Sequence, residues 1–267
     1  MDWPQAREPL AAPIFAPFAD AIAKLPRGRW PTHDDLTQAA ADVVTSHGRC
    51  VRFAAPRAPG DRDRRSYELR IAETGEVETR AQNWHDLFNA LVWIAFPGAK
   101  AAINAQHAAI LAERGAAEAR ARGPERDALT LFDEGGVAVA SSDPALTKLI
   151  VDFEWKELFW RRRAEVAEKM RFVAFGHALL EKALAPHVGI VAKTIFLPMD
   201  PLPEEAHLVY AIDARLAAHF ADRGRFASPR AMAPMPVLGV PGWHPQTAHE
   251  SFYDDRDHFR AKTGGVA

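Results

Sequence analysis

The residues with the clearest chemical potential are polar side chains on a segment that is otherwise apolar. Residues 84–96 predict a helix whose apolar side chains cover all of its sides, as expected of a buried helix. Asn83 is expected to cap this helix, and Asp86 has the charge that a helix N-terminus favours. His85 and Asn89 lack such an explanation, and their spacing of four places them on one face.

A second helix is expected over residues 100–114, after a break at residues 97–98. It holds Lys100, Asn104 and His107, whose spacings of four and three also place them on one face. A break this short favours an αα-hairpin. In an antiparallel pair His107 would lie level with Asn89, and the polar residues of the two helices would form one buried cluster.

A cluster of histidine, asparagine and aspartate side chains is compatible with three roles. In the first, His85 and His107 bind a divalent metal ion that activates water. In the second, one histidine is a general base near neutral pH, and the helix N-terminus binds an anion. In the third, the cluster is a buried hydrogen-bond network. The spacing does not match a specific metal motif such as His-Glu-x-x-His. The candidate catalytic residues are His85, Asp86, Asn89 and His107.

Other polar residues are candidates for ligand binding. Asp133 is expected in a turn, His177 begins a helical segment, and Lys193 interrupts an apolar strand. Asp254 lies among aromatic residues near the C-terminus. Turn chemistry, strand edges and surface segments also explain such residues. The full set of candidate binding residues is Asn83, Asn104, Asp133, His177, Lys193 and Asp254.

Composition excludes several classes of protein. The 267 residues are 48% hydrophobic and 25% charged, which is typical of a globular protein. A net charge of -2 argues against nucleic acid and anionic membranes as partners. With one cysteine, Cys50, neither an internal disulfide nor a cysteine-built metal site can form. The most apolar stretch, residues 87–103, contains polar residues and a proline, and the N-terminus does not resemble a signal peptide. We therefore expect a cytoplasmic protein.

The pattern of elements predicts a helix-rich α+β protein with a short sheet. Residues 1–30 are proline-rich and predict an irregular arm, residues 31–260 a single α+β domain, and residues 261–267 a tail. Alternation of apolar and polar residues around turn sequences predicts two β-hairpins, at 67–80 and 128–140. A strand is expected over 188–197 and a helix over 204–223. Phosphate-binding glycine loops, dinucleotide-binding glycine motifs and the Gly-x-Ser-x-Gly motif are absent from the sequence.

Several longer strings resemble one known family. They are NWHDLFNALVW at 83–93, ALTLFDE at 128–134, FGHAL at 175–179, VLGVPGW at 237–243 and FYDD at 252–255. Together they resemble the proteobacterial domain-of-unknown-function family 3025, over roughly residues 30 to 260. The resemblance implies a single full-length domain and a bacterial source. It implies no activity, cofactor or catalytic residue.

Two functions are compatible with these observations. The first is a hydrolase of small molecules or phosphoesters, with a small-molecule ligand in the polar cluster and a divalent metal ion as an optional component. The second is a non-enzymatic binding or assembly protein, in which the cluster is structural and the aromatic, proline-rich C-terminal segment forms a partner surface. A concave site reached by solvent would favour the first, and a dry, fully paired cluster the second.

Overall fold

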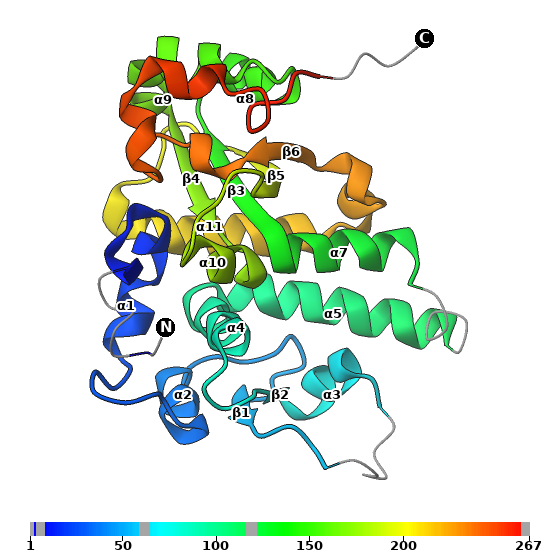
Figure 1. Ribbon diagram of the computed structural model, residues 1–267. Helices are drawn as coiled ribbons and strands as arrows, with labels where there is room; N and C mark the ends of the chain where they lie inside the picture. Colours follow the sequence, from blue (N-terminus) through cyan, green and yellow to red (C-terminus); the bar gives the residue numbers. More distant parts are fainter. Residues whose placement is uncertain (1–2, 4–8, 59–64, 116–121, 263–267) are drawn as a thin grey trace.

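A four-stranded mixed sheet lies at the centre of the protein (Figure 1). The structure is a computed structural model that describes residues 3, 9–58, 65–115 and 122–262. The strand order is β4-β3-β5-β6, with β3 parallel to β5 and the outer pairs antiparallel. The strands are β3 (Gly136–Ser141), β4 (Met170–Ala174), β5 (Val191–Pro198) and β6 (Ala233–Pro236).

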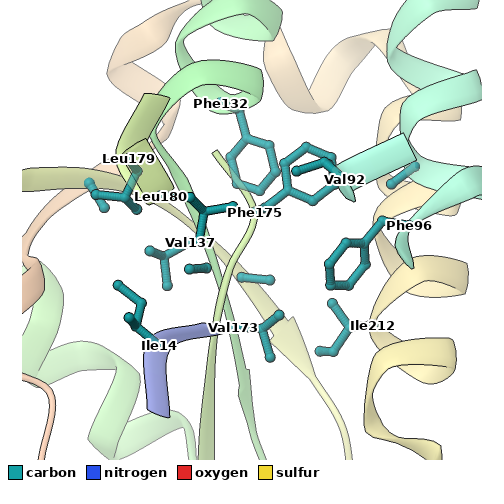
Figure 2. Packing of buried hydrophobic residues seen from close by; sticks show 14 of the residues in the cluster. Ile14, Val92, Phe96, Phe132, Val137, Val173, Phe175, Leu179, Leu180 and Ile212 are labelled. Carbon is teal, nitrogen blue, oxygen red and sulfur yellow. The ribbon is translucent and has the colours of Figure 1, made fainter. Parts of the chain in front are cut away.

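Strand β3 is inside the protein because its sequence is apolar on both faces. Each of its residues is buried, and helices α7 (Pro124–Gly135), α8 (Pro144–Val151) and α11 (Glu205–Ala221) contact it. Phenylalanine rings fill the space beside it (Figure 2). The ring of Phe175 lies 5.1 Å from that of Phe132 and 5.5 Å from that of Phe96, measured between centroids. This core anchors the helices that carry the candidate site.

The prediction of a first β-hairpin, at 67–80, is wrong. Residues Tyr67–Thr74 form helix α3. Strand β2 (Glu76–Glu78) pairs in parallel with β1 (Arg52–Ala54), a strand that precedes α3 in the sequence. A five-residue alternation is too short to separate a strand from a helix. Gly75 ends the helix with a φ of 75°, and a side chain there would collide with the backbone of Cys50.

The prediction of a second β-hairpin, at 128–140, is wrong as well. The segment expected as its first strand belongs to helix α7, and only its second half is a strand, β3. Within α7 the buried residues Ala128, Leu129 and Phe132 follow helical spacing and face the core. Asp133 therefore lies in the last turn of a helix rather than in a hairpin turn.

The break at residues 97–98 produces a corner rather than an antiparallel hairpin. Helices α4 (Trp84–Ala95) and α5 (Pro97–Arg114) are bent by 110° at this point. The Asp213 carboxylate of α11 accepts hydrogen bonds from the backbone N–H groups of Gly98 (3.0 Å) and Ala99 (2.7 Å). These donors have no partner within their own helix. Asp213 thus ties the start of α5 to α11, and α5 leaves the axis of α4.

The remaining segments pack on this framework. The described part of residues 1–30 contains α1 (Ala19–Ala23) and two 3-10 turns, and its apolar side chains belong to the main core. Helix α2 (His33–Ala39) begins with a capping box, α9 (Arg163–Lys169) precedes β4, and α10 (His177–Ala183) follows it. Short 3-10 turns form the C-terminal segment, whose Phe252, Tyr253 and Phe259 are buried.

The fold class is confirmed as α+β, helix-rich and single-domain. The expected strand at 188–197 and helix at 204–223 are present as β5 and α11. Across the described ranges, we find no single helix that is both long enough and apolar enough to cross a membrane.

Candidate functional site

A cleft of about 560 Å³ opens between helices α3, α4, α5, α7 and α10. Figure 1 shows α7 above α5 and α3 below α5, with α10 above α4. Buried faces of these helices pack together, and the polar residues at their ends and edges are left to line the cleft. Its lining residues are Pro56, Ser66, Tyr67, Glu68, Glu78, Arg80, His85, Asp86, Asn89, His107, Arg122, Arg126, Thr130, Asp133, Glu134 and His177.

Two histidines from distant parts of the sequence meet in the wall of this cleft. Nε2 of His85, on α4, lies 3.0 Å from Nε2 of His177, at the start of α10. Nδ1 of His85 lies 3.1 Å from Oε2 of Glu181, one turn further along α10. Residues four apart share a helix face, so α10 contacts both nitrogens of the His85 ring. One third of the His85 side chain is exposed (33%), whereas that of His177 is buried (9%).

A continuous polar network extends from this pair into the protein. Oδ2 of Asp133 lies 3.7 Å from Nδ1 of His177. The Lys100 ammonium group donates to both oxygens of Asp133, at 2.6 Å and 2.9 Å, and to Oδ1 of Asn89 at 2.9 Å. Asn89 in turn donates to the Tyr67 hydroxyl at 3.3 Å. The network therefore links helices α3, α4, α5, α7 and α10.

Burial and the neighbouring charges set the protonation of this network. Burial, aided by Lys100, lowers the pKa of His177 to about 4, although the charge of Asp133 opposes the change. His177 is therefore neutral at pH 7. Burial opposes ionisation of Asp133, but Lys100 and His177 together hold the pKa of this carboxyl below its usual value.

The Tyr67 hydroxyl stays protonated at neutral pH. It lies next to the buried amide of Asn89, although 37% of the residue is exposed. Burial and the nearby charge of Glu68 raise the pKa of this phenol above its usual value. A protonated hydroxyl in the cleft can donate a hydrogen bond to a ligand.

His107 lies in another part of the cleft and does not face Asn89 as expected. Its Nδ1 accepts a hydrogen bond from Nε of Arg126 at 3.2 Å. Burial lowers the pKa of His107; Glu68 opposes this change, and Arg126 adds to it. The corner between α4 and α5 separates the two residues, and Lys100 takes the position beside Asn89.

The other candidates are spread over the structure. Asn83 caps α4 by accepting from the N–H of Asp86 at 3.0 Å, as expected. Asp86 lines the cleft and binds the Arg80 guanidinium through both of its oxygens, at 2.8 Å and 2.9 Å. Asn104 donates to Oε2 of Glu68 at 2.7 Å and lies just behind the cleft lining.

Lys193 and Asp254 lie outside the cleft. Lys193 is on β5, where its register partners are Gly136 and Pro234. Asp254 is exposed and pairs with Lys156 at 2.8 Å. Neither residue contributes to the lining.

No cluster of three or more histidine, cysteine, aspartate or glutamate residues in the described ranges is arranged to hold a metal ion. The partner of His85 is His177 rather than the expected His107. The expected metal site at His85 and His107 stays a prediction.

The family of the chain follows from comparison with known proteins. The sequence model described as "Protein of unknown function (DUF3025)" matches residues 51–263, which is most of the chain. The chain belongs to this family. Neither a curated protein nor a solved structure matches it. The matched range includes every residue that lines the cleft.

Several residues that line the DUF3025 cleft, or contact the side chains that line it, were not among the sequence candidates. They are Tyr67, Lys100, Arg126 and Glu181. A signal for Glu181 was available, because it follows His177 by four residues on one helix. Tyr67 carried no such signal, since its segment was expected to be a strand.

Proposed function

We propose that this DUF3025 protein is a hydrolase of small polar substrates, with His85 as the general base. One observation carries the proposal: two histidine rings joined through Nε2 atoms 3.0 Å apart, with a carboxylate on the far side of each, in the wall of an open cleft. Histidine is the side chain best suited to move protons near neutral pH. The site is a concave cleft open to solvent rather than a dry, fully paired cluster. This supports an enzyme or a ligand-binding protein over a purely structural network.

The surroundings of the histidine pair favour its protonated form, as the number of hydrogens on the two rings shows. With two hydrogens on four ring nitrogens, His85 donates from Nδ1 to Glu181, and His177 donates from Nε2 to His85. Nδ1 of His177 then lacks a hydrogen, and no described residue donates a hydrogen bond to it. With a third hydrogen, His85 donates from both nitrogens, and His177 presents its Nδ1 hydrogen to Asp133. The two carboxylates therefore complement the pair that has gained a proton.

The proposed reaction uses this preference. A water molecule in the cleft attacks the carbonyl or phosphoryl centre of the substrate and gives its proton to Nε2 of His85. The water takes the place of His177 beside this nitrogen during the attack. Glu181 stabilises the imidazolium, and His177 then accepts the hydrogen bond from it. The bond to the leaving group breaks, and the proton passes from His85 to that group, so the products are an acid and an alcohol.

Tyr67 and Asn89 have supporting roles in this proposal. The protonated Tyr67 hydroxyl donates a hydrogen bond to the oxygen that becomes negative in the transition state. Asn89 holds that hydroxyl from Nδ2, while Lys100 holds Asn89 from the other side. A divalent metal ion remains an optional addition, and none of these steps passes through one. A cytoplasmic location in a bacterial cell completes the proposal, consistent with a single cysteine.

The test is hydrolysis of a panel of p-nitrophenyl carboxylate and phosphate esters by the purified protein. In the His85→Gln variant we expect turnover to fall by about 10²–10⁴-fold. His177→Gln should shift the pH profile of the remaining activity, because His177 positions the His85 ring and accepts the hydrogen bond from its imidazolium form. His187→Gln, at an exposed histidine outside the cleft, is the matched control.

Two outcomes contradict the hydrolase. One is turnover that is the same in wild type and His85→Gln. The other is a folded protein that binds ligands in the cleft and turns over no ester in the panel, which favours the binding-protein alternative.

A further inference from the structure

The cations nearest the histidine pair are matched by acids. The Arg80 guanidinium binds both oxygens of Asp86, at 2.8 Å and 2.9 Å, and the backbone N–H of Arg80 donates to the same carboxylate at 2.6 Å. The Lys100 ammonium group binds both oxygens of Asp133. Each of these pairs contains one positive and one negative charge. Neither pair therefore leaves a net positive charge beside the histidines.

Glu181 adds a negative charge at the same place. Its Oε2 lies 3.1 Å from Nδ1 of His85, and 43% of its side chain is exposed. Within the described ranges, no lysine or arginine forms an ion pair with it. The bonds to Asp86 raise the pKa of the Arg80 guanidinium, and the charge of Glu181 adds to this effect. Glu181 therefore acts on the space around His85 and Arg80 without a cation of its own.

Further acids on the cleft wall keep this sign. Glu134 lines the cleft and is exposed, and its backbone lies against Gly176, directly before His177. Glu78 also lines the cleft, but its charge is matched by Arg70 at 2.9 Å. The surroundings of the histidine pair thus carry a net negative charge, from Glu181 and Glu134.

The other arginines of the cleft act on a different residue. Arg122 and Arg126 line the cleft, and Nε of Arg126 donates to Nδ1 of His107 at 3.2 Å. Burial lowers the pKa of His107, and both arginines add to this effect. Neither arginine is among the groups that chiefly set the pKa of His177, which depends on burial and on its own neighbours. The charge beside the histidine pair is therefore set locally.

The donors near the pair suit a substrate that starts without charge. The Tyr67 hydroxyl is neutral, and Arg80 uses two of its five side-chain N–H groups on Asp86, which also balances its charge. Attack on a carboxylic ester develops a single negative charge, which such donors can stabilise. A phosphate monoester is already anionic before the reaction, and sites for phosphoryl groups supply unmatched positive charge. The residues beside His85 fit the carboxylic ester better.

We propose that the substrate is a carboxylic ester that is uncharged around the reacting bond, and that Glu181 disfavours phosphate monoesters at this position. The preference for an uncharged ligand follows from the charges beside His85, whereas the reaction rests on the proposed hydrolase. Repulsion between like charges at short range near a protein surface changes a dissociation constant by on the order of tenfold. In the reaction the water oxygen bonds to the carbonyl carbon. The bond from this carbon to the alcohol oxygen breaks, and the alcohol leaves with the proton from His85.

The charge preference is tested by binding, without any reaction. The neutral probe is p-nitrophenylacetone, in which a CH₂ group replaces the bridging oxygen of p-nitrophenyl acetate. The anionic probe is p-nitrobenzylphosphonate, which is related in the same way to p-nitrophenyl phosphate and carries two charges above about pH 8. Calorimetric titration at that pH compares wild type with Glu181→Gln. Glu168→Gln, at an exposed acid outside the cleft, is the matched control.

We expect wild type to bind the ketone at least about tenfold more tightly than the phosphonate. Glu181→Gln should reduce this ratio by at least about threefold because it removes the negative charge beside His85, whereas Glu168→Gln should keep the ratio. Phosphonate binding as tight as ketone binding overturns the proposal, as does a ratio that Glu181→Gln leaves unchanged. Absence of ketone binding up to about 20 mM, a level that detects millimolar dissociation constants, also overturns it.

The two proposals fail in different ways. Turnover of p-nitrophenyl acetate and p-nitrophenyl phosphate is measured beside the binding experiment. Binding that prefers the ketone and depends on Glu181, without turnover of either ester, supports the charge preference and contradicts the hydrolase. Turnover that depends on His85 and is at least as fast for the phosphate as for the acetate supports the hydrolase and contradicts the carboxylic ester.

Discussion

The ammonium group of Lys100 lies 2.6 Å and 2.9 Å from the two oxygens of Asp133, with the lysine almost completely shielded from solvent. Asp133 lies in the last turn of α7, where a helix disfavours negative charge, so Lys100 compensates an acid in an unfavourable place. The same ammonium group contacts Asn89 and so connects α5 to both α4 and α7. One lysine therefore holds three of the helices that form the cleft.

Removing this lysine should destabilise the protein. In Lys100→Met the Asp133 carboxylate is left buried and without its cation, which costs about 3–5 kcal/mol of the free energy of unfolding. In the double variant Lys100→Met, Asp133→Leu both charges are gone, and most of that loss should be recovered. Urea unfolding of the three proteins measures both values. A single variant as stable as wild type would show that the pair does not hold the helices together.

Gly176 sets the distance between α7 and α10, directly before His177. A side chain at this position would lie under 3.0 Å from the backbone of Glu134 and Gly135. Gly176→Ala should therefore push the two helices apart, at a cost of about 1–3 kcal/mol of unfolding free energy. It should also move His177 away from His85 and lower any activity that depends on the pair.

The neighbouring Gly135 supplies the control for this prediction. A side chain there meets no atom within 4 Å. Gly135→Ala should leave stability within about 0.5 kcal/mol of wild type or raise it, because alanine favours the helix. Urea unfolding and ester turnover compare the two variants, and equal effects would contradict the close approach at Gly176.

The depressed pKa of His177 predicts how stability depends on pH. The imidazole titrates near 6.5 in the unfolded chain and at about 4 in the folded protein. Between these values the unfolded chain binds more protons, so the free energy of unfolding falls as the pH falls from about 6.5 to about 4. The difference of about 2.5 pH units corresponds to about 3 kcal/mol. His177→Asn should lose that much less stability than wild type between pH 7 and pH 4.

Urea unfolding at a series of pH values measures this difference. Acidic groups titrate in both proteins over the same range, so their contributions largely cancel in the comparison. Parallel pH curves for wild type and His177→Asn would mean that His177 is protonated in the folded protein as readily as in the unfolded chain.

The long, regular elements could be predicted because their signals repeat over many residues. The apolar helix at 84–95 with its Asn83 cap, the strand at 191–198 and the helix at 205–221 are of this kind. The two hairpins could not be predicted, because four or five alternating residues fit a strand and a helix equally well. Packing against the surrounding helices decides that the segments of Tyr67 and Asp133 are helical.

For the site, sequence spacing identified residues, while packing decided which of them meet. His85, Asp86, Asn89, His107, Asp133 and His177 were all candidates, and all line the cleft. For all of them except Asp133, which was expected in a turn, the helix position follows from local sequence. The contact of His85 with His177 spans 92 positions and depends on how α10 crosses α4.

What the sequence by itself determined is therefore the class of fold, the buried helix that carries His85 and Asn89, and the family to which the chain belongs. Only the tertiary structure decided that His177 rather than His107 is the partner of His85, and that Lys100 holds Asn89 and Asp133. The physical reason is that local spacing fixes the direction of side chains within one helix. The angle between helices depends on contacts made by distant residues, such as the binding of Asp213 to the start of α5.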